Sequence, residues 1–152
     1  MPMGFSLDGI DIRIIKILAK NGRAPFTEIA ADLKVTEKTV RTHYKQLIEK
    51  EIITITGVVN PLSIGLNALA IVWLKVELNR LDEVIENIKR MKEVRFVSVV
   101  TGKYQLIIQV NVSTQEDLKE SFQRLNKIGG IYEVNSMIQL EVLKDTFEYF
   151  LK

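Results

Sequence analysis

The chain contains no cysteine and a single histidine among its 152 residues. The absence of cysteine excludes disulfides, thiolate metal sites and cysteine nucleophiles. It is typical of a protein from a reducing compartment, so we expect a cytoplasmic location. A lone histidine excludes a metal site built from several histidines. No phosphate-binding glycine loop is present either, and we therefore expect no catalytic residues, no metal site and no cofactor.

Long apolar runs are also missing. The longest, residues 68–74, is far shorter than the roughly 20 residues that a membrane-spanning helix needs. The first residues show no basic region followed by an apolar stretch, so we expect no secretory signal and no membrane partner. With 47% hydrophobic and 26% charged residues, the composition is that of a folded globular protein.

Net charge is low, at +2, but it is unevenly distributed. Residues 1–60 carry 9 basic and 7 acidic side chains, whereas residues 61–152 carry 12 of each. Within residues 34–50, five basic side chains face two acidic ones. The positive excess therefore lies in the N-terminal block, where a nucleic acid could be bound.

Up to residue 51, apolar residues recur with helical spacing and predict three helices. The first follows Asp8 as its N-cap, the second opens near Pro25, and the third follows Thr36. A β-branched strand is expected at residues 52–59. Two short helices joined by a tight turn, the second of them basic, are typical of a helix-turn-helix.

The rest of the chain favours the order strand, helix, strand, strand, helix, strand, the ferredoxin-like βαββαβ pattern. A capping box of Ser113 with Glu116 is expected to begin the second helix. The expected elements are strand 67–78, helix 81–91, a hairpin of strands 94–101 and 104–112, helix 114–128 and strand 131–143.

These patterns predict an α+β protein in four parts. Residues 1–52 form a helix-turn-helix (winged-helix-like) DNA-binding domain, and residues 53–66 form a linker strand and hinge. Residues 67–144 form a ferredoxin-like domain for oligomerisation. Residues 145–152 form a C-terminal tail, in which Phe147, Phe150 and Leu151 suggest docking on a surface such as another subunit.

One face of the predicted sheet is apolar although both helices should cover the other face. Its residues are Leu69, Ile71, Trp73, Ile107, and Val97 or Val99. An apolar sheet face exposed to water needs a partner, so we expect self-association there. The alternative is an error in the assumed register of short apolar strands.

Basic and hydroxyl side chains mark the outward face of the third helix. Near its start, Lys38, Arg41 and Thr42 would reach base edges in the major groove. Lys34, Thr36 and Lys45 would meet phosphates. The alternative is an ordinary solvated basic helix face.

Short motifs along about residues 5–144 form a further pattern: Leu7-Asp8-Gly9-Ile10-Asp11, Asn21-Gly22-Arg23, Glu28-Ile29-Ala30, Val35-Thr36-Glu37, Thr39-Val40-Arg41, Asn60-Pro61 and Thr101-Gly102-Lys103-Tyr104. In these motifs the chain resembles the leucine-responsive/AsnC ("feast/famine", Lrp/AsnC) family of prokaryotic transcriptional regulators. The resemblance implies a sequence-specific DNA-binding regulator that dimerises through its sheet domains and often assembles further, commonly as a tetramer of dimers, an octamer. It also implies that residues 67–144 sense an effector, a small amino acid bound between dimers.

The resemblance adds residues to both expected sites. Thr39 matches the recognition-helix motif, and His43 stands where the family usually has arginine, so both join the expected DNA contacts. Glu51 replaces the usual glycine after this helix, which predicts a less sharply ended helix. For the effector it implies Thr101, Gly102, Tyr104, Gln105, Ser136 and Ile138, although Gln105 replaces an acidic residue of the family.

Two other functions are found with a similar architecture. A sensor or assembly module could bind an amino acid without reading DNA, but it would not need a basic helix-turn-helix. Some haem-pathway decarboxylases share the architecture, yet they carry a basic stretch after the third helix. Here residues 52–56 read Ile-Ile-Thr-Ile-Thr, so we do not expect an enzyme.

Overall fold

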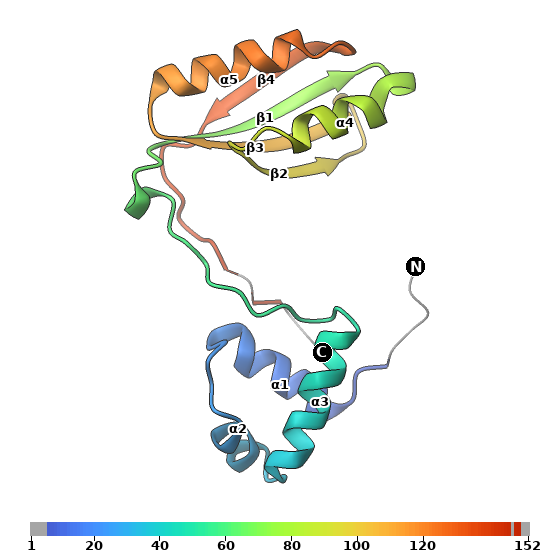
Figure 1. The fold of residues 1–152 in the computed structure, drawn as a ribbon, viewed down its shortest axis with the longest axis vertical. Helices are drawn as coiled ribbons and strands as arrows, with labels where there is room; N and C mark the ends of the chain where they lie inside the picture. Colours follow the sequence, from blue (N-terminus) through green and yellow to red (C-terminus); the bar gives the residue numbers. More distant parts are fainter. Residues whose placement is uncertain (1–5, 147, 150–152) are drawn as a thin grey trace. The chain divides into compact units, whose positions relative to one another are not determined.

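The computed structural model describes residues 6–146 and 148–149, so Phe147, Phe150 and Leu151 lie outside the described residues. The chain divides into two compact units, residues 1–58 with 144–152, and residues 59–143 (Figure 1). The described tail residues thus belong to the N-terminal unit, where Glu148 lies 4.0 Å from Lys20. No helix in the described part is long and apolar enough to cross a membrane.

The N-terminal unit consists of α1 (Gly9–Lys20), α2 (Phe26–Leu33) and α3 (Glu37–Glu49). Asp8 caps α1 by accepting hydrogen bonds from two backbone N–H groups, and Thr36 caps α3, both as predicted. Pro25 is the N-cap of α2. The buried side chains that join the three helices are Ile14, Leu18, Ile29, Ala30, Leu33, Val40 and Leu47.

The end of α3 is sharp, so the expectation drawn from Glu51 is wrong. Glu51 takes the left-handed conformation, with φ of 55°. The N–H of Ile52 donates to the carbonyl of Leu47 at 2.9 Å, and the N–H of Glu51 to that of Ile48 at 3.0 Å. This is the hydrogen-bond pattern of a Schellman cap, formed here without glycine.

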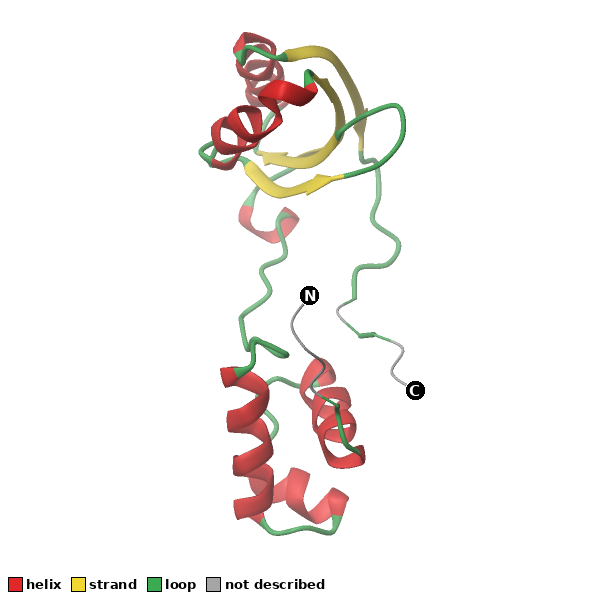
Figure 2. Ribbon diagram, turned by 90° about the vertical axis from the view of Figure 1, so that its right-hand side faces the viewer, coloured by secondary structure: helices red, strands yellow, loops and turns green. Residues whose placement is uncertain are grey.

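The expected strand at residues 52–59 is not formed. Residues 53–60 have no regular structure, and Figure 2 draws the segment after α3 as a loop. Val58 and Val59 are 64% and 61% exposed. The β-branched residues favour an extended backbone, but a strand also needs a neighbour, and the sheet of the described residues contains only β1 to β4. A short 3-10 turn, Leu62–Ile64, precedes that sheet.

The second unit is the predicted βαββαβ arrangement. Its sheet is antiparallel in the order β2-β3-β1-β4. Its elements are β1 (Ala68–Val76), the 3-10 turn η2 (Leu78–Arg80), α4 (Leu81–Lys89), β2 (Val94–Val99), β3 (Leu106–Val112), α5 (Gln115–Lys127) and β4 (Ile131–Ile138).

Two local expectations in this unit are corrected. The capping box of α5 joins Thr114 with Asp117, one residue beyond the predicted pair. Strand β4 ends at Ile138 and not at residue 143, because its partner β1 begins at Ala68. The N–H of Gln139 donates to Leu69 at 2.8 Å beyond the last rung.

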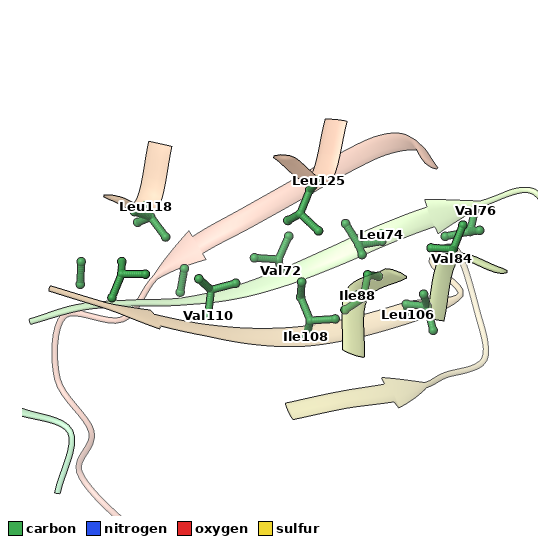
Figure 3. Packing of buried hydrophobic residues seen from close by; sticks show 13 residues of the cluster. Val72, Leu74, Val76, Val84, Ile88, Leu106, Ile108, Val110, Leu118 and Leu125 are labelled. Atoms are coloured by element: carbon green, nitrogen blue, oxygen red, sulfur yellow. The ribbon is translucent and has the colours of Figure 1, made fainter. Parts of the chain in front are cut away.

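Helices α4 and α5 cover one face of the sheet (Figure 1). Val72, Leu74 and Ile108 point from the strands towards Leu118 and Leu125 of α5 and Ile88 of α4 (Figure 3). All of these side chains are at most 2% exposed. Alternate residues of β1, from Ala68 to Val76, belong to this core, whereas Leu78, the last residue of the predicted strand 67–78, lies past the strand and is 74% exposed.

The opposite face carries the predicted apolar residues of β1 and β3 but a different residue of β2. Directly paired residues share a face, and Val97 pairs with Ile108 while Val99 pairs with Leu106. Both valines therefore lie on the helix-covered side, and assigning either of them to the open face was wrong. An irregularity between Val94 and Phe96 shifts the alternation, so that Phe96, 49% exposed, occupies the open face.

Candidate functional site

The turn between α2 and α3 orients the start of α3. Lys34 ends α2 in the left-handed conformation, with φ of 57°, and the N–H of Val35 donates to Ala30 at 3.0 Å. Thr36 then accepts a hydrogen bond from the N–H of Thr39 at 3.1 Å, and the two threonine hydroxyls are 2.8 Å apart. With Val40 and Leu47 buried, the opposite side of α3 is left exposed.

Four of the expected DNA contacts form that exposed side. Lys38, Arg41, Thr42 and Lys45 are all exposed. The hydroxyl of Thr42 donates to the carbonyl of Lys38 at 3.0 Å. Lys45 lies 3.6 Å from Glu49 and remains 75% exposed. The pair of Lys45 with Glu49 is therefore a surface pair, which a phosphate can displace.

Arg41 is the most constrained of these side chains. Its Nε donates to Glu37 at 2.8 Å, and its Nη2 also pairs with that carboxylate. The guanidinium lies 5.0 Å from the centroid of the Phe26 ring, which in turn packs against Tyr44 with centroids 4.9 Å apart. An aromatic ring and a carboxylate thus orient one cation at the N-terminal end of α3.

His43 differs from the other expected DNA contacts. Its side chain is only 19% exposed, and its Nδ1 lies 2.7 Å from Oδ1 of Asp11 in α1. With Asp8, these residues are the three metal-ligating side chains that the described structure brings within 4.8 Å of one another. The carboxylates already accept the hydrogen bonds of the capping box that begins α1, so the cluster caps this helix and holds a histidine.

The expected effector residues of the hairpin lie at one end of the sheet. Thr101 and Gly102 are exposed, and Gly102 has φ of 113°, a conformation that favours glycine. The hydroxyl of Tyr104 donates to Oε1 of Glu133 at 2.9 Å. Lys103 donates to the same oxygen at 2.9 Å, so the turn between β2 and β3 meets β4 at one carboxylate.

Glu133 was not predicted as a site residue. Hydrogen bonds from Lys103 and Tyr104 lower the pKa of its carboxyl, and the same carboxylate raises the pKa of Lys103. The alternation of residues along β4 could have pointed to Glu133, because it puts this carboxylate on the face of the sheet that also carries Lys75 of β1, its paired residue. The family resemblance implies instead Ser136 and Ile138, which lie further along the same strand.

Gln105, Ser136 and Ile138 are placed differently from Tyr104. The side-chain oxygen of Gln105 accepts from the N–H of Val76 at 2.9 Å, which closes the end of the sheet. Ser136 and Ile138 pair with Val72 and Ala70 and so belong to the helix-covered side. Tyr104 reaches Glu133 on the open face, so one chain does not bring these residues together in a single pocket.

Comparison with known proteins agrees with both units. The model of the Lrp/AsnC ligand binding domain matches residues 69–149. The model of a winged helix-turn-helix DNA-binding domain matches residues 7–54. Together the two matches cover the helical unit, the sheet unit and part of the tail.

Relatives match along their full length. The HTH-type transcriptional regulator FL11 of Pyrococcus abyssi is 34% identical over 151 residues, 99% of this chain and 100% of that protein. FL11 of Pyrococcus furiosus is 33% identical, covering 96% and 97%.

Solved structures share the fold at lower identity. AsnC of E. coli superposes with a TM-score of 0.87 at 19% identity, covering 93% of this chain and 97% of that one. A feast or famine regulatory protein from M. tuberculosis, complexed with L-methionine, gives 0.88 at 21%, covering 95% and 99%.

Proposed function

Since this chain belongs to the Lrp/AsnC family of helix-turn-helix transcriptional regulators, we propose that α3 is the helix with which it reads DNA. The observation that carries the proposal is the exposed row of Lys38, Arg41, Thr42 and Lys45 on a helix whose other side is buried. A sensor that does not bind DNA, the alternative considered above, finds no support in the structure or in the relatives.

The residues divide by their position along α3. Lys38, Arg41 and Thr42, near the start of the helix, contact base edges in the major groove. Lys34, Thr36 and Lys45 contact phosphates, and Thr39 shapes the N-terminal turn through its hydrogen bonds to Thr36. A DNA-binding role and a chain without cysteine both support a cytoplasmic location.

Binding to a duplex that the wild-type chain selects from a random-sequence pool tests this assignment. Changing Lys38, Arg41 and Lys45 together to alanine should reduce affinity by about a hundredfold and flatten its salt dependence. The control changes Lys89, Lys119 and Lys127 of the sheet unit to alanine, an equal loss of charge that should leave binding nearly intact. If the α3 triple variant binds like the wild type, α3 does not read DNA.

Self-association through the open sheet face completes the DNA-binding unit. Ile71, Trp73 and Ile107 lie there beside the exposed Phe96 and Met137. A second copy packed on this face would cover the apolar side chains.

Sedimentation velocity tests the assembly. We expect the wild type to sediment as a dimer or as a tetramer of dimers, and Trp73→Lys to shift it towards the monomer. Leu78→Lys, which changes an apolar residue that is already 74% exposed, should sediment like the wild type. A dimer would present two recognition helices about 34 Å apart to a pseudo-palindromic site. A monomeric wild type at micromolar concentration would refute the proposed interface.

A small amino acid is the proposed effector, bound beside the turn of Thr101, Gly102 and Tyr104 where dimers meet. One structural neighbour binds L-methionine. Lys103, Tyr104 and Glu133 offer both signs of charge and a hydroxyl, which suit the amino and carboxylate groups of a zwitterion. Because Gln105, Ser136 and Ile138 lie apart from this cluster within one chain, their part in the site requires a neighbouring subunit.

Titration calorimetry with each of the twenty amino acids tests the effector site. Tyr104→Phe removes the hydroxyl that bonds Glu133 and should weaken binding of the effector about tenfold. Tyr132→Phe, the same change on the exposed β4, should not. Equal affinity of the two variants would place the effector elsewhere, and no heat with any amino acid would remove this part of the proposal.

A further inference from the structure

The contact between His43 and Asp11 links the middle of α3 to the first turn of α1. Nδ1 of His43 lies 2.7 Å from Oδ1 of Asp11 and 3.9 Å from Oδ2 of Asp8. Asp11 is 2% exposed and His43 is half-buried. The contact is therefore shielded from water. In such surroundings a charge-assisted hydrogen bond is stronger than at the surface.

Asp11 is a rigid anchor for this contact. Its Oδ2 accepts from the N–H of Asp8 at 3.1 Å, and its own N–H donates to Oδ1 of Asp8 at 2.8 Å. These two bonds form the capping box that begins α1. A buried carboxylate held in this way needs a second donor, and His43 supplies it from 32 residues away in the sequence.

From this geometry we propose that His43 is a positioning residue that sets the orientation of the recognition helix, and not a DNA contact. The inference rests on α3 being that helix. Val40 and Leu47, the buried apolar side chains of α3, attract the neighbouring helices without fixing an angle. A directional hydrogen bond to a buried carboxylate does fix one.

The opposite flank of α3 is held by a second directional contact. Arg41 lies over Phe26 of α2, and its bond to Glu37 within α3 itself holds the guanidinium in place against that ring. With His43 held by Asp11 on one flank and Arg41 on the other, α3 cannot rotate about its axis without breaking one of the two. The exposed row of Lys38, Arg41, Thr42 and Lys45 consequently keeps one orientation relative to α1 and α2.

The proposal has a spectroscopic signature. An ionised carboxylate only accepts hydrogen bonds, so Nδ1 of His43 must carry a proton even when the imidazole is neutral. His43 is the only histidine of the chain, so nitrogen NMR reports this ring without overlap. We expect the Nδ1–H tautomer in the wild type and a larger share of the Nε2–H form in Asp11→Ala.

Four variants separate positioning from DNA contact: His43→Asn, His43→Gln, Asp11→Asn and the double variant Asp11→Asn/His43→Gln. Asparagine places an amide N–H close to where Nδ1 stands, whereas glutamine places it further out. We expect His43→Asn to keep most of the affinity for the selected duplex and His43→Gln to lose about tenfold. Asp11→Asn should lose a similar factor, and the double variant no more than either alone. Affinity for poly(dI-dC), which samples phosphate contacts, should change little in all four.

Gln46→Ala, on an exposed site of the same helix, is the control and should bind like the wild type. Circular dichroism restricts the comparison to temperatures at which each variant is folded. The proposal is overturned if Asp11→Asn binds the selected duplex like the wild type while His43→Gln weakens binding to both duplexes, which is the pattern of a DNA contact. An Nε2–H tautomer in the wild type also overturns it. If the wild type selected no duplex, the DNA-reading role of α3 would fail while the tautomer would still report the Asp11 contact.

Discussion

The two units of this chain expose opposite kinds of surface. The helical unit presents charge: Lys38, Arg41 and Lys45 stand on α3, while its apolar residues are shared between three short helices. The sheet unit covers one face with α4 and α5 and leaves the other open, with apolar side chains such as Phe96 and Met137 exposed on it. A charged surface suits a polyanion and exposed apolar side chains suit a second protein. The proposed functions therefore divide DNA reading and assembly between units with separate cores.

Substituting one buried leucine in each core is the strongest test that the two cores are separate. Leu47 of α3 and Leu106 of β3 are both 0% exposed. Leu47→Ala should destabilise the helical unit, and Leu106→Ala the sheet unit, by about 3 kcal/mol each through lost contacts and a cavity. Differential scanning calorimetry should show each change lowering one transition only. An equal shift of the whole profile by either variant would mean that the two cores unfold as one.

Within the sheet unit, the ion pair of Glu93 with Arg124 predicts a pH dependence. Burial raises the pKa of Glu93, but hydrogen bonds from its backbone N–H, Arg124 and Ser121 outweigh it, so the pKa lies below its usual value. A lowered pKa stabilises the fold above the unfolded pKa, near 4.3, and this contribution is lost as the pH falls through the folded pKa.

Glu93→Gln should therefore cost about 1.5 kcal/mol at pH 7 and close to nothing near pH 3, measured by urea unfolding. Glu120→Gln is the matched control, because its carboxylate is exposed and lies 4.0 Å from the same arginine. It should have little effect at either pH. A loss at pH 3 as large as at pH 7 would assign the effect of Glu93→Gln to packing.

In the helical unit, Glu37 places a negative charge beside the basic side chains that are proposed to read DNA. Glu37→Gln removes a negative charge and frees Arg41, so affinity for poly(dI-dC) should rise about fivefold at 0.1 M salt. Affinity for the selected duplex should rise less, since Arg41 loses its fixed orientation. Glu49→Gln makes the same charge change in the last turn of α3 and should act more weakly. Equal gains on both duplexes would mean that Glu37 only repels phosphate.

The smallest expected effect is at the end of α3. Glu51 holds a left-handed backbone conformation, which costs a residue with a side chain about 1 kcal/mol. Glycine avoids this cost but loses more conformational entropy on folding, so only part of the gain remains. Glu51→Gly should stabilise the helical unit by about 0.5 kcal/mol, measured as a small rise of its melting temperature. Lys50→Gly, at the C-cap with φ of −91°, should not stabilise it.

The sequence predicted most of the fold because the decisive patterns are local. Apolar spacing and the caps Asp8 and Thr36 locate α1 and α3, and alternation in β1 identifies its buried side. The prediction was wrong where the structure of a segment depends on pairing with another strand. Residues 53–60 are β-branched yet unpaired, β4 stops where β1 begins, and an irregularity in β2 moves Phe96 and not Val97 to the open face.

The candidate site divides in the same way. The spacing of basic residues along one helix face is readable from the chain, so Lys38, Arg41 and Lys45 were predicted and are exposed together. The contact of His43 with Asp11 and that of Tyr104 with Glu133 join residues 32 and 29 positions apart. No local pattern encodes such a distance.

Fold class, the order of the elements and the basic helix thus follow from residue periodicity, because helices and strands repeat at fixed intervals along the chain. Which side chains meet does not. Sheet register and helix packing bring Glu133 to the hairpin and turn His43 away from the exposed row, since both depend on contacts between segments that are distant in the sequence. Only the folded chain decides them.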